Sequence, residues 1–166
     1  MKRAFLMILT FALLCSCQKG PAVFPDKIRL PQGPFRVSVV FSGGVSEAGA
    51  EFTGAEGEYR LLFTSPEHLS GMEAGLREGQ VSFHYRGLDA GMPDGLLFQG
   101  SYLRILADVF EAASQLETEK EKSALSIRRA EQDFVLELDP ETGYPLSLAA
   151  EGFRADFSGF SPSAFS

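Results

Sequence analysis

The two cysteines of the chain, Cys15 and Cys17, are the residues whose positions most clearly indicate chemistry. Both lie at the end of an apolar run, residues 4–14, which follows two basic residues. The run is shorter than the about 20 residues that a membrane-spanning helix needs, but it has the length of the apolar part of a secretory signal. Because a cysteine thiolate is a nucleophile, a cysteine at the end of such a segment is a candidate for covalent modification during export.

The residues around Cys17 resemble the lipobox of bacterial lipoproteins, with Leu14 three residues before the cysteine and Ser16 directly before it. In a lipobox the cysteine thiol is diacylated and the signal is cut in front of it. The resemblance implies that residues 1–16 are a lipoprotein signal peptide and that Cys17 carries the lipid. Cys15 is the alternative lipidation site, although the bulky Leu14 precedes it where a small residue is required. A second alternative is an ordinary secretory signal in which both cysteines are incidental.

A lipid anchor on Cys17 would hold the protein at a membrane, outside the cytoplasm. One acyl chain binds membranes only weakly, and the two or more chains added at a lipobox would make the anchoring stable. In a cell with two membranes, Gln18 in place of an aspartate after the anchor favours the outer membrane, facing the periplasm. In a cell with one membrane, the anchor predicts the outer face of the cell membrane.

Residues that could support catalysis do not form a recognisable set. His68 and His84 are not at the spacing of metal ligands, and no cysteine remains beyond the signal region to join them. No Gly-x-Ser-x-Gly sequence is present, and the glycine-rich segments lack the Lys-Ser/Thr of a phosphate-binding loop. Glu137 and Asp139 share a strand face, which fits a solvated acidic surface. We therefore predict a protein that is not an enzyme and that holds no cofactor and no metal.

The charge balance excludes some binding partners. The chain has 15 basic and 22 acidic residues, and removal of residues 1–16 leaves 13 basic residues and a net charge of about −9. So acidic a domain is unsuited to nucleic acid or to the surface of an anionic bilayer. The remaining 150 residues contain no cysteine, so the domain must be stabilised by its hydrophobic core without disulfides, and this length is sufficient for one.

Most of the chain has the alternating pattern of short β-strands. Residues 17–34 contain the lipidated cysteine and several prolines, which indicates an extended tether. Residues 35–158 form the predicted domain, and residues 159–166 a loosely ordered tail. Strands are expected over 35–42, 48–52, 59–63, 69–76, 81–85, 124–129, 134–138, 146–150 and 153–157, because apolar side chains alternate with polar ones and turn residues separate the runs.

One segment has the period of a helix instead. Apolar residues recur at i, i+3, i+4, i+7, i+8 and i+11 from Tyr102 to Ala113, and Ser101 is a suitable N-cap. The charged residues 117–122 are expected to form a solvated loop. Since the apolar face of a sheet is the only large surface that can cover the helix, the predicted fold class is α+β. It is a curved antiparallel sheet of about eight or nine strands, a half-barrel, packed over one main amphipathic helix.

Three segments resemble the Lol-type, lipoprotein carrier-like half-barrel family. They are residues 63–71, a strand ending in a proline turn; residues 78–85, a glycine turn followed by an alternating aromatic strand; and residues 139–146, a late hairpin. Their order along residues 35–158 gives the resemblance its weight. It implies that a lipid or an acyl chain binds between the concave face of the sheet and the helix, in a protein of cell-envelope biogenesis.

Strand parity gives the residues that would face such a ligand: Phe35, Val37, Val39, Phe41, Phe63, Phe83, Phe110 and Phe134. The same residue types also build an ordinary core, so composition does not separate a lined cavity from a filled one. A second functional hypothesis is an interaction lipoprotein that docks a partner envelope protein, or that forms a homodimer, through its sheet.

Overall fold

The computed structural model describes residues 27–43, 47–55, 57–97, 101–119, 121–129 and 131–162. Cys17, with the signal and most of the predicted tether, lies outside the described residues. The described elements, in chain order, are β1 (Lys27–Ile28), β2 (Phe35–Ser42), β3 (Ala48–Ala55), β4 (Glu58–Ser65), β5 (Glu73–Arg77), β6 (Gln80–Tyr85), β7 (Leu88–Pro93), η2 (Asp94–Leu96), α2 (Tyr102–Ala113), β8 (Thr118–Glu119), β9 (Ala124–Arg129), β10 (Gln132–Leu138), β11 (Pro145–Ala150) and β12 (Phe153–Pro162).

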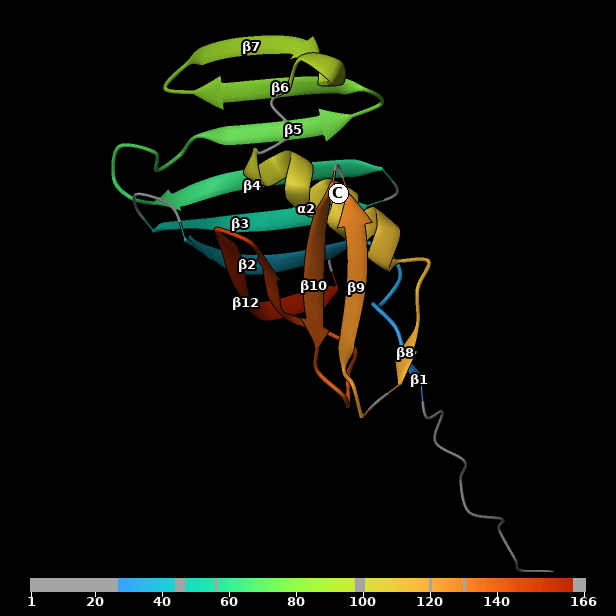
Figure 1. The fold of residues 1–166 in the computed structure, drawn as a ribbon. Helices are drawn as coiled ribbons and strands as arrows, with labels where there is room; N and C mark the ends of the chain where they lie inside the picture. Colours follow the sequence, from blue (N-terminus) through green and yellow to red (C-terminus); the bar gives the residue numbers. More distant parts are fainter. Residues whose placement is uncertain are drawn as a thin grey trace, which may run out of the picture.

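Ten of these strands form one antiparallel sheet in the order β7-β6-β5-β4-β3-β2-β12-β11-β10-β9. Two meanders, β2 to β7 and β9 to β12, are joined through the pairing of β2 with β12. Helix α2 connects the strand at one edge, β7, to the strand at the other edge, β9, so it crosses the hollow of the curved sheet (Figure 1). The predicted fold class, a curved antiparallel half-barrel over one main helix, is confirmed.

Two-residue turns set the pairing of neighbouring strands. Glu78 and Gly79 have φ angles of 48° and 73°, and Arg86 and Gly87 have φ angles of 49° and 79°. Positive φ at both central residues is the type I′ geometry, whose twist matches that of the flanking strands. Turns this short leave no alternative to pairing between β5 and β6 and between β6 and β7.

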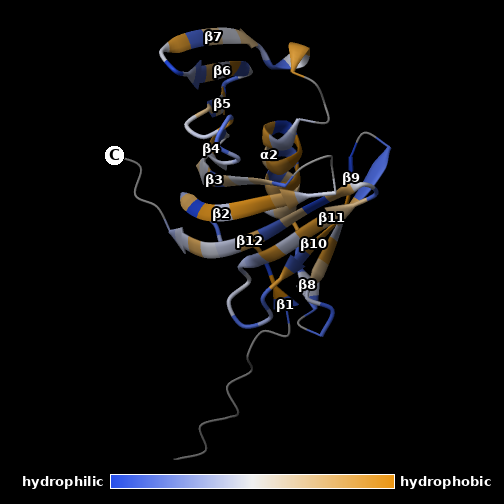
Figure 2. Cartoon of the chain, turned by 90° about the vertical axis from the view of Figure 1, so that its left-hand side faces the viewer, coloured by the Kyte–Doolittle hydropathy of each residue, from blue (hydrophilic) through white to orange (hydrophobic). Residues whose placement is uncertain are grey.

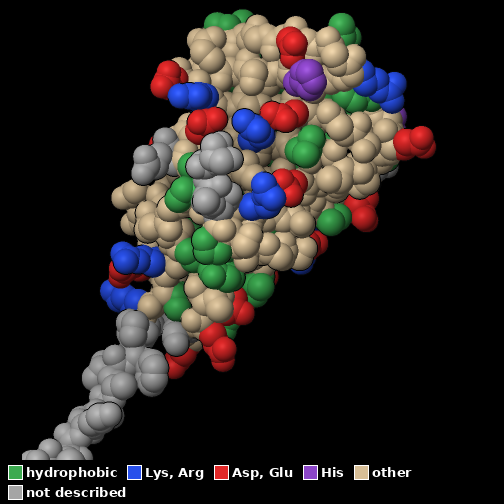
Figure 3. Space-filling model, turned by 180° about the vertical axis from the view of Figure 1, so that it is seen from behind, with side chains coloured by type: hydrophobic (Ala, Val, Ile, Leu, Met, Phe, Trp, Pro, Cys, Tyr) green, Lys and Arg blue, Asp and Glu red, His purple; other side chains and the backbone are tan. Residues whose placement is uncertain are grey.

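The sheet is apolar on its concave face and charged on its convex face. In β2, the side chains at Phe35, Val37, Val39 and Phe41 are buried while those between them are exposed or half-buried, as an alternating strand requires. Orange colouring in Figure 2 gathers on α2 and on the strands that face it. The convex face, seen in Figure 3, shows basic and acidic side chains as neighbours. One ion pair joins Arg60 of β4 to Glu73 of β5, whose Nε and Oε1 lie 3.3 Å apart.

Helix α2 follows the predicted pattern closely. Ser101 is the N-cap, and its side-chain oxygen accepts a hydrogen bond from the backbone N–H of Arg104 at 3.4 Å. The ring of Tyr102 stacks on that of Phe41 with centroids 4.1 Å apart, which fixes the start of the helix on β2. Its buried face presents Leu106 and Val109 to the sheet, both fully excluded from solvent. None of the described helices is long and apolar enough to cross a membrane.

The structure differs from the sequence prediction at both ends of the domain. Residues 27–34, assigned to the tether, contain β1, which pairs with β8, so the expected solvated loop over 117–122 is partly a strand. Ile28 and Leu30 are buried in the core. Their segment lies against the turn before β11, so closely that a Cβ on Gly143 would clash with the carbonyl oxygen of Arg29. Residues 159–162, assigned to the tail, belong to β12, which pairs with the start of β2.

Two differences lie in the middle of the chain. β7 was not predicted, and the strand expected over 69–76 is a turn followed by β5. The turn is stabilised by backbone bonds, among them Leu69 N–H to Pro66 O at 2.9 Å and Gly71 N–H to Phe63 O at 2.9 Å. The described strands therefore number more than the eight or nine expected.

Candidate functional site

A cavity of about 340 Å³ opens at one end of the space between α2 and the sheet. It is lined by residues from the segment after β1, from β2, from the β3–β4 hairpin and from the C-terminal end of α2. These residues are Leu30, Pro31, Gln32, Gly33, Phe35, Gly54, Ala55, Gly57, Tyr59, Phe110, Glu111 and Ser114. The volume is in the range of small-molecule sites, about 300–1,000 Å³.

The floor of the cavity is apolar and largely aromatic. Phe35, Tyr59 and Phe110 are all buried, and the rings of Phe35 and Phe110 stack with centroids 5.1 Å apart. Phe52 supports the floor from below, with its centroid 5.2 Å from that of Phe110 and 5.9 Å from that of Tyr59. Gly54 lies directly under this layer: a Cβ there would approach the Phe35 ring to 2.6 Å and the Tyr59 ring to 3.0 Å. The shape of the cavity thus depends on a residue without a side chain.

The rim of the cavity is polar and exposed. Gln32, Gly33, Gly57 and Glu111 are exposed to solvent. The Gln32 amide donates from Nε2 to the backbone oxygen of Ser114 at 2.9 Å, so the segment after β1 is fixed to the end of α2. The cavity therefore combines an apolar interior with a polar opening, the arrangement that suits a ligand with one apolar and one polar end.

The hydroxyl of Tyr59 lies near two carboxylates. Burial raises the pKa of Tyr59 above its ordinary value, and the nearby carboxylates of Glu111 and Asp108 raise it further. The phenol is therefore neutral at physiological pH and can donate or accept a hydrogen bond at the cavity.

The predicted ligand-facing residues divide into two groups. Phe35 and Phe110 line the cavity. The other six lie on the side of the sheet that carries the core: Val37, Val39, Phe41, Phe63 and Phe134 are buried, and Phe83 is half-buried against the core. That these residues face a ligand stays a prediction. Tyr59, Leu30 and Glu111 were not predicted as site residues.

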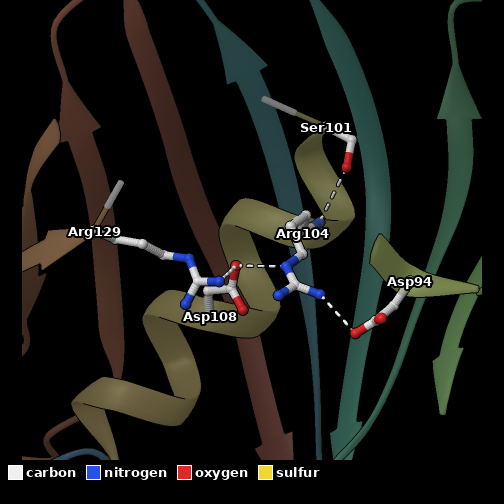
Figure 4. A network of polar contacts seen from close by, with 5 residues as sticks. All are labelled: Asp94, Ser101, Arg104, Asp108 and Arg129. Atoms are coloured by element: carbon white, nitrogen blue, oxygen red, sulfur yellow. Dashed lines mark hydrogen bonds and ion pairs between the residues drawn. The ribbon is translucent and has the colours of Figure 1, made fainter. Parts of the chain in front are cut away.

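A charged network fixes α2 between the two edges of the sheet (Figure 4). Asp108, only 7% exposed, accepts a hydrogen bond from Arg104 Nε at 2.9 Å and forms an ion pair with Arg129 of β9. Arg104 also contacts Asp94 of η2, with Nη1 and Oδ2 3.0 Å apart. Burial raises the pKa of Asp108, and the two guanidinium groups oppose that rise. The network connects the β7 end of the sheet, the helix and the β9 end.

The two histidines are on the surface. His84 Nδ1 lies 2.6 Å from Asp89 Oδ1, and this hydrogen bond raises the pKa of His84. His68 is exposed, and its backbone oxygen accepts a hydrogen bond from the Tyr85 hydroxyl at 2.5 Å. Within the described part of the chain, no three His, Cys, Asp or Glu side chains are grouped so that they could hold a metal ion.

Comparison with solved structures finds a protein of similar fold. An uncharacterized conserved protein from Thermus thermophilus superposes with a TM-score of 0.50 at 12% identity, over 81% of this chain and 82% of that one. This likeness shows a shared fold and, at so low an identity, nothing beyond the fold.

Two further matches have TM-scores below 0.5 and support no inference about this chain. The LolA superfamily protein NE2245 from Nitrosomonas europaea matches at a TM-score of 0.46 and 9% identity, over 84% of this chain and 90% of that one. A putative outer membrane lipoprotein-sorting protein domain from Vibrio parahaemolyticus matches at a TM-score of 0.41 and 10% identity, over 80% and 86%. No protein-family model and no curated protein matches the sequence.

Proposed function

We propose that this protein is an extracytoplasmic lipoprotein, anchored by lipid on Cys17, that binds an apolar ligand such as a lipid or an acyl chain in its half-barrel. It acts without catalysing a reaction, in the biogenesis of the cell envelope. The observation that carries the proposal is the cavity of about 340 Å³ between α2 and the sheet, with its aromatic floor and polar rim. The lipobox-like sequence before Cys17 supports the anchor and the location.

Phe35 and Phe110, with Tyr59, are the residues that we propose contact the ligand directly. The ligand's apolar part lies against these rings, and its polar end is at the exposed rim. Of the six other residues on the concave face, Phe41 and Phe63 contact the ring of Tyr102 at the start of α2.

Binding of an uncharged fluorescent fatty alcohol by a matched pair of glycine variants tests the proposal. Gly54→Ala places a methyl group against the Phe35 and Tyr59 rings. The displaced rings disturb the floor, so the affinity is expected to fall severalfold. The unfolding free energy is expected to fall by about 1–3 kcal/mol, as for other overpacked sites. Gly95→Ala is the control, because its Cβ would meet nothing within 4 Å and its φ is not positive. Equal affinities of both variants and the parent, or no binding by the parent, would contradict the proposal.

The second candidate, docking of a partner envelope protein or self-dimerisation through the sheet, is favoured by one observation. β7 is at the edge of the sheet and is exposed along nearly its whole length, and Leu88 at its start and Leu96 in η2 are 75% and 73% exposed. An unpaired edge strand can accept a strand from another chain.

The register of β7 gives this candidate a specific test. In an antiparallel pair, every second residue directs its backbone N–H and C=O to the neighbouring strand. Asp94 N–H donates to Gly79 O at 2.9 Å, so the residues two and four positions earlier, Met92 and Ala90, also face β6. The backbone groups of Gly91 therefore point away from β6. Gly91→Pro therefore blocks strand addition without breaking the β6–β7 ladder. Loss of a dimer in analytical ultracentrifugation would support docking at this edge; a monomer before the change would contradict self-dimerisation.

A further inference from the structure

The cavity has a charge character that any ligand must match. Among the described residues that line it there is one carboxylate, Glu111, and neither a lysine nor an arginine. We propose that the ligand is an amphiphile whose polar end is an organic cation, an alkylammonium group, and that Glu111 recognises this cation. The inference rests on the proposed function, because it specifies the chemical class of the apolar ligand.

Glu111 differs from the carboxylates around it. On the convex face, Glu51, Glu58 and Glu73 each lie within 4 Å of an arginine on a neighbouring strand. Asp108, one turn before Glu111 on α2, pairs with two arginines. Among the described residues, no lysine or arginine lies within ion-pair distance of Glu111. Its carboxylate is therefore available at the rim to pair with a charge that the ligand supplies.

The surroundings of Glu111 strengthen the preference for a cation. Burial raises the pKa of Tyr59, and the Glu111 carboxylate raises it further, so Glu111 is close enough to act on the cavity floor. The helix also ends here: α2 stops at Ala113 and Ser114 lines the cavity. A helix C-terminus carries partial negative charge, which attracts cations and repels anions within the last turn. An anionic headgroup, such as a fatty-acid carboxylate, is therefore disfavoured at this opening.

The apolar floor of the cavity favours a cation that also carries an alkyl chain. Below the rim, the buried rings of Phe35, Tyr59 and Phe110 offer apolar surface for an alkyl chain. The ammonium group remains at the exposed Glu111, where it keeps part of its hydration, while the chain enters the cavity. This arrangement avoids the free-energy cost of burying a charge.

Three short probes of similar length separate charge from apolarity: hexyltrimethylammonium, 1-octanol and octanoate, each used well below its aggregation limit. Binding to the full chain is measured by titration calorimetry in nanodiscs of an uncharged galactolipid, with empty nanodiscs as the reference. The cation is expected to bind about fivefold more tightly than the alcohol, as one partly exposed ion pair allows, and octanoate is expected to bind most weakly.

Substitutions at Glu111 test the assignment of the residue. Glu111→Gln is expected to remove the preference for the cation while leaving the affinity for 1-octanol unchanged, and Glu111→Lys is expected to reverse the order of cation and anion. Glu141→Gln, an exposed carboxylate away from the cavity, is the control and should change none of the three affinities.

The outcomes distinguish this inference from the proposed function. Equal binding of all three probes would overturn the cation preference and leave apolar binding intact. No binding of any probe would overturn both. A preference for the cation that survives Glu111→Gln would overturn the role of Glu111.

Discussion

The coupling between Asp108 and Arg129 tests whether the charged network holds α2 between the edges of the half-barrel. Removing one partner of a buried ion pair costs about 3–5 kcal/mol, because it leaves an uncompensated charge. Here Arg129 is 38% exposed and Arg104 keeps its contact with Asp94, so water can hydrate part of the charge that remains. For Asp108→Leu we therefore expect a loss below that range, about 2–3 kcal/mol of unfolding free energy.

A double-mutant cycle separates the pair from packing effects. Arg129→Leu alone leaves Asp108 paired with Arg104 and is expected to cost about 1–2 kcal/mol. The double variant should cost less than the sum of the single ones, with a coupling of about 1–2 kcal/mol, because no charge is then left without a partner. Urea unfolding followed by circular dichroism gives all four free energies.

The same strands supply a matched control pair. Arg128 Nε and Asp133 Oδ1 lie 3.9 Å apart on β9 and β10, and both side chains are 76% exposed. An ion pair this exposed contributes little, so its coupling should stay below about 0.5 kcal/mol. Couplings of equal size for the two pairs, or additive losses at Asp108 and Arg129, would refute the view that the network fixes the helix.

Three further predictions follow from single sites. Cys17→Ser is expected to release the protein from the membrane fraction, as measured by fractionation and mass spectrometry of the N-terminus; retained lipid would contradict the anchor. Ser101→Ala removes the N-cap of α2 and is expected to cost about 1 kcal/mol in urea unfolding, whereas an unchanged midpoint would contradict the cap. Backbone and side-chain hydrogen bonds from Thr142, and the backbone of Glu141, lower the pKa of Asp139. The folded state therefore binds this proton less readily than the unfolded chain, so the stabilisation by Asp139 is present above about pH 4 and is lost as the pH falls further. Asp139→Asn should accordingly be less stable than the parent at about pH 6 and closer to it at about pH 3; a constant difference would contradict this.

Strong periodicity is what made the fold predictable. The alternation from Phe35 to Phe41 and the helical spacing from Tyr102 to Ala113 each fix a buried face without any reference to the rest of the chain. β7 was missed because its sequence, Leu-Asp-Ala-Gly-Met-Pro, contains a glycine and a proline and is stabilised by pairing with β6. β1 and β8 have two residues each, too few to show a period.

The site was predictable only in part, because parity indicates a face but not what covers it. Phe35 and Phe41 share one face of β2, yet Tyr102 stacks on Phe41 while Phe35 borders the cavity. Gly54 lies beyond the strand expected over 48–52, but in the structure it belongs to β3, where a side chain would meet the Phe35 and Tyr59 rings. Asp108, a buried carboxylate beside the apolar stripe of α2, belongs to the charged network, but nothing in the sequence identified Arg129 as its partner.

Native mass spectrometry of a form beginning at Gln18, purified from a bacterial host without detergent, tests most directly whether the half-barrel binds an apolar ligand. The expected result is a reproducible added mass equal to that of a lipid or fatty amphiphile, released by organic solvent and diminished in Gly54→Ala but not in Gly95→Ala. Protein at the bare chain mass that also takes up no added amphiphile would contradict apolar binding and leave the exposed β7 edge as the surface to test for partners.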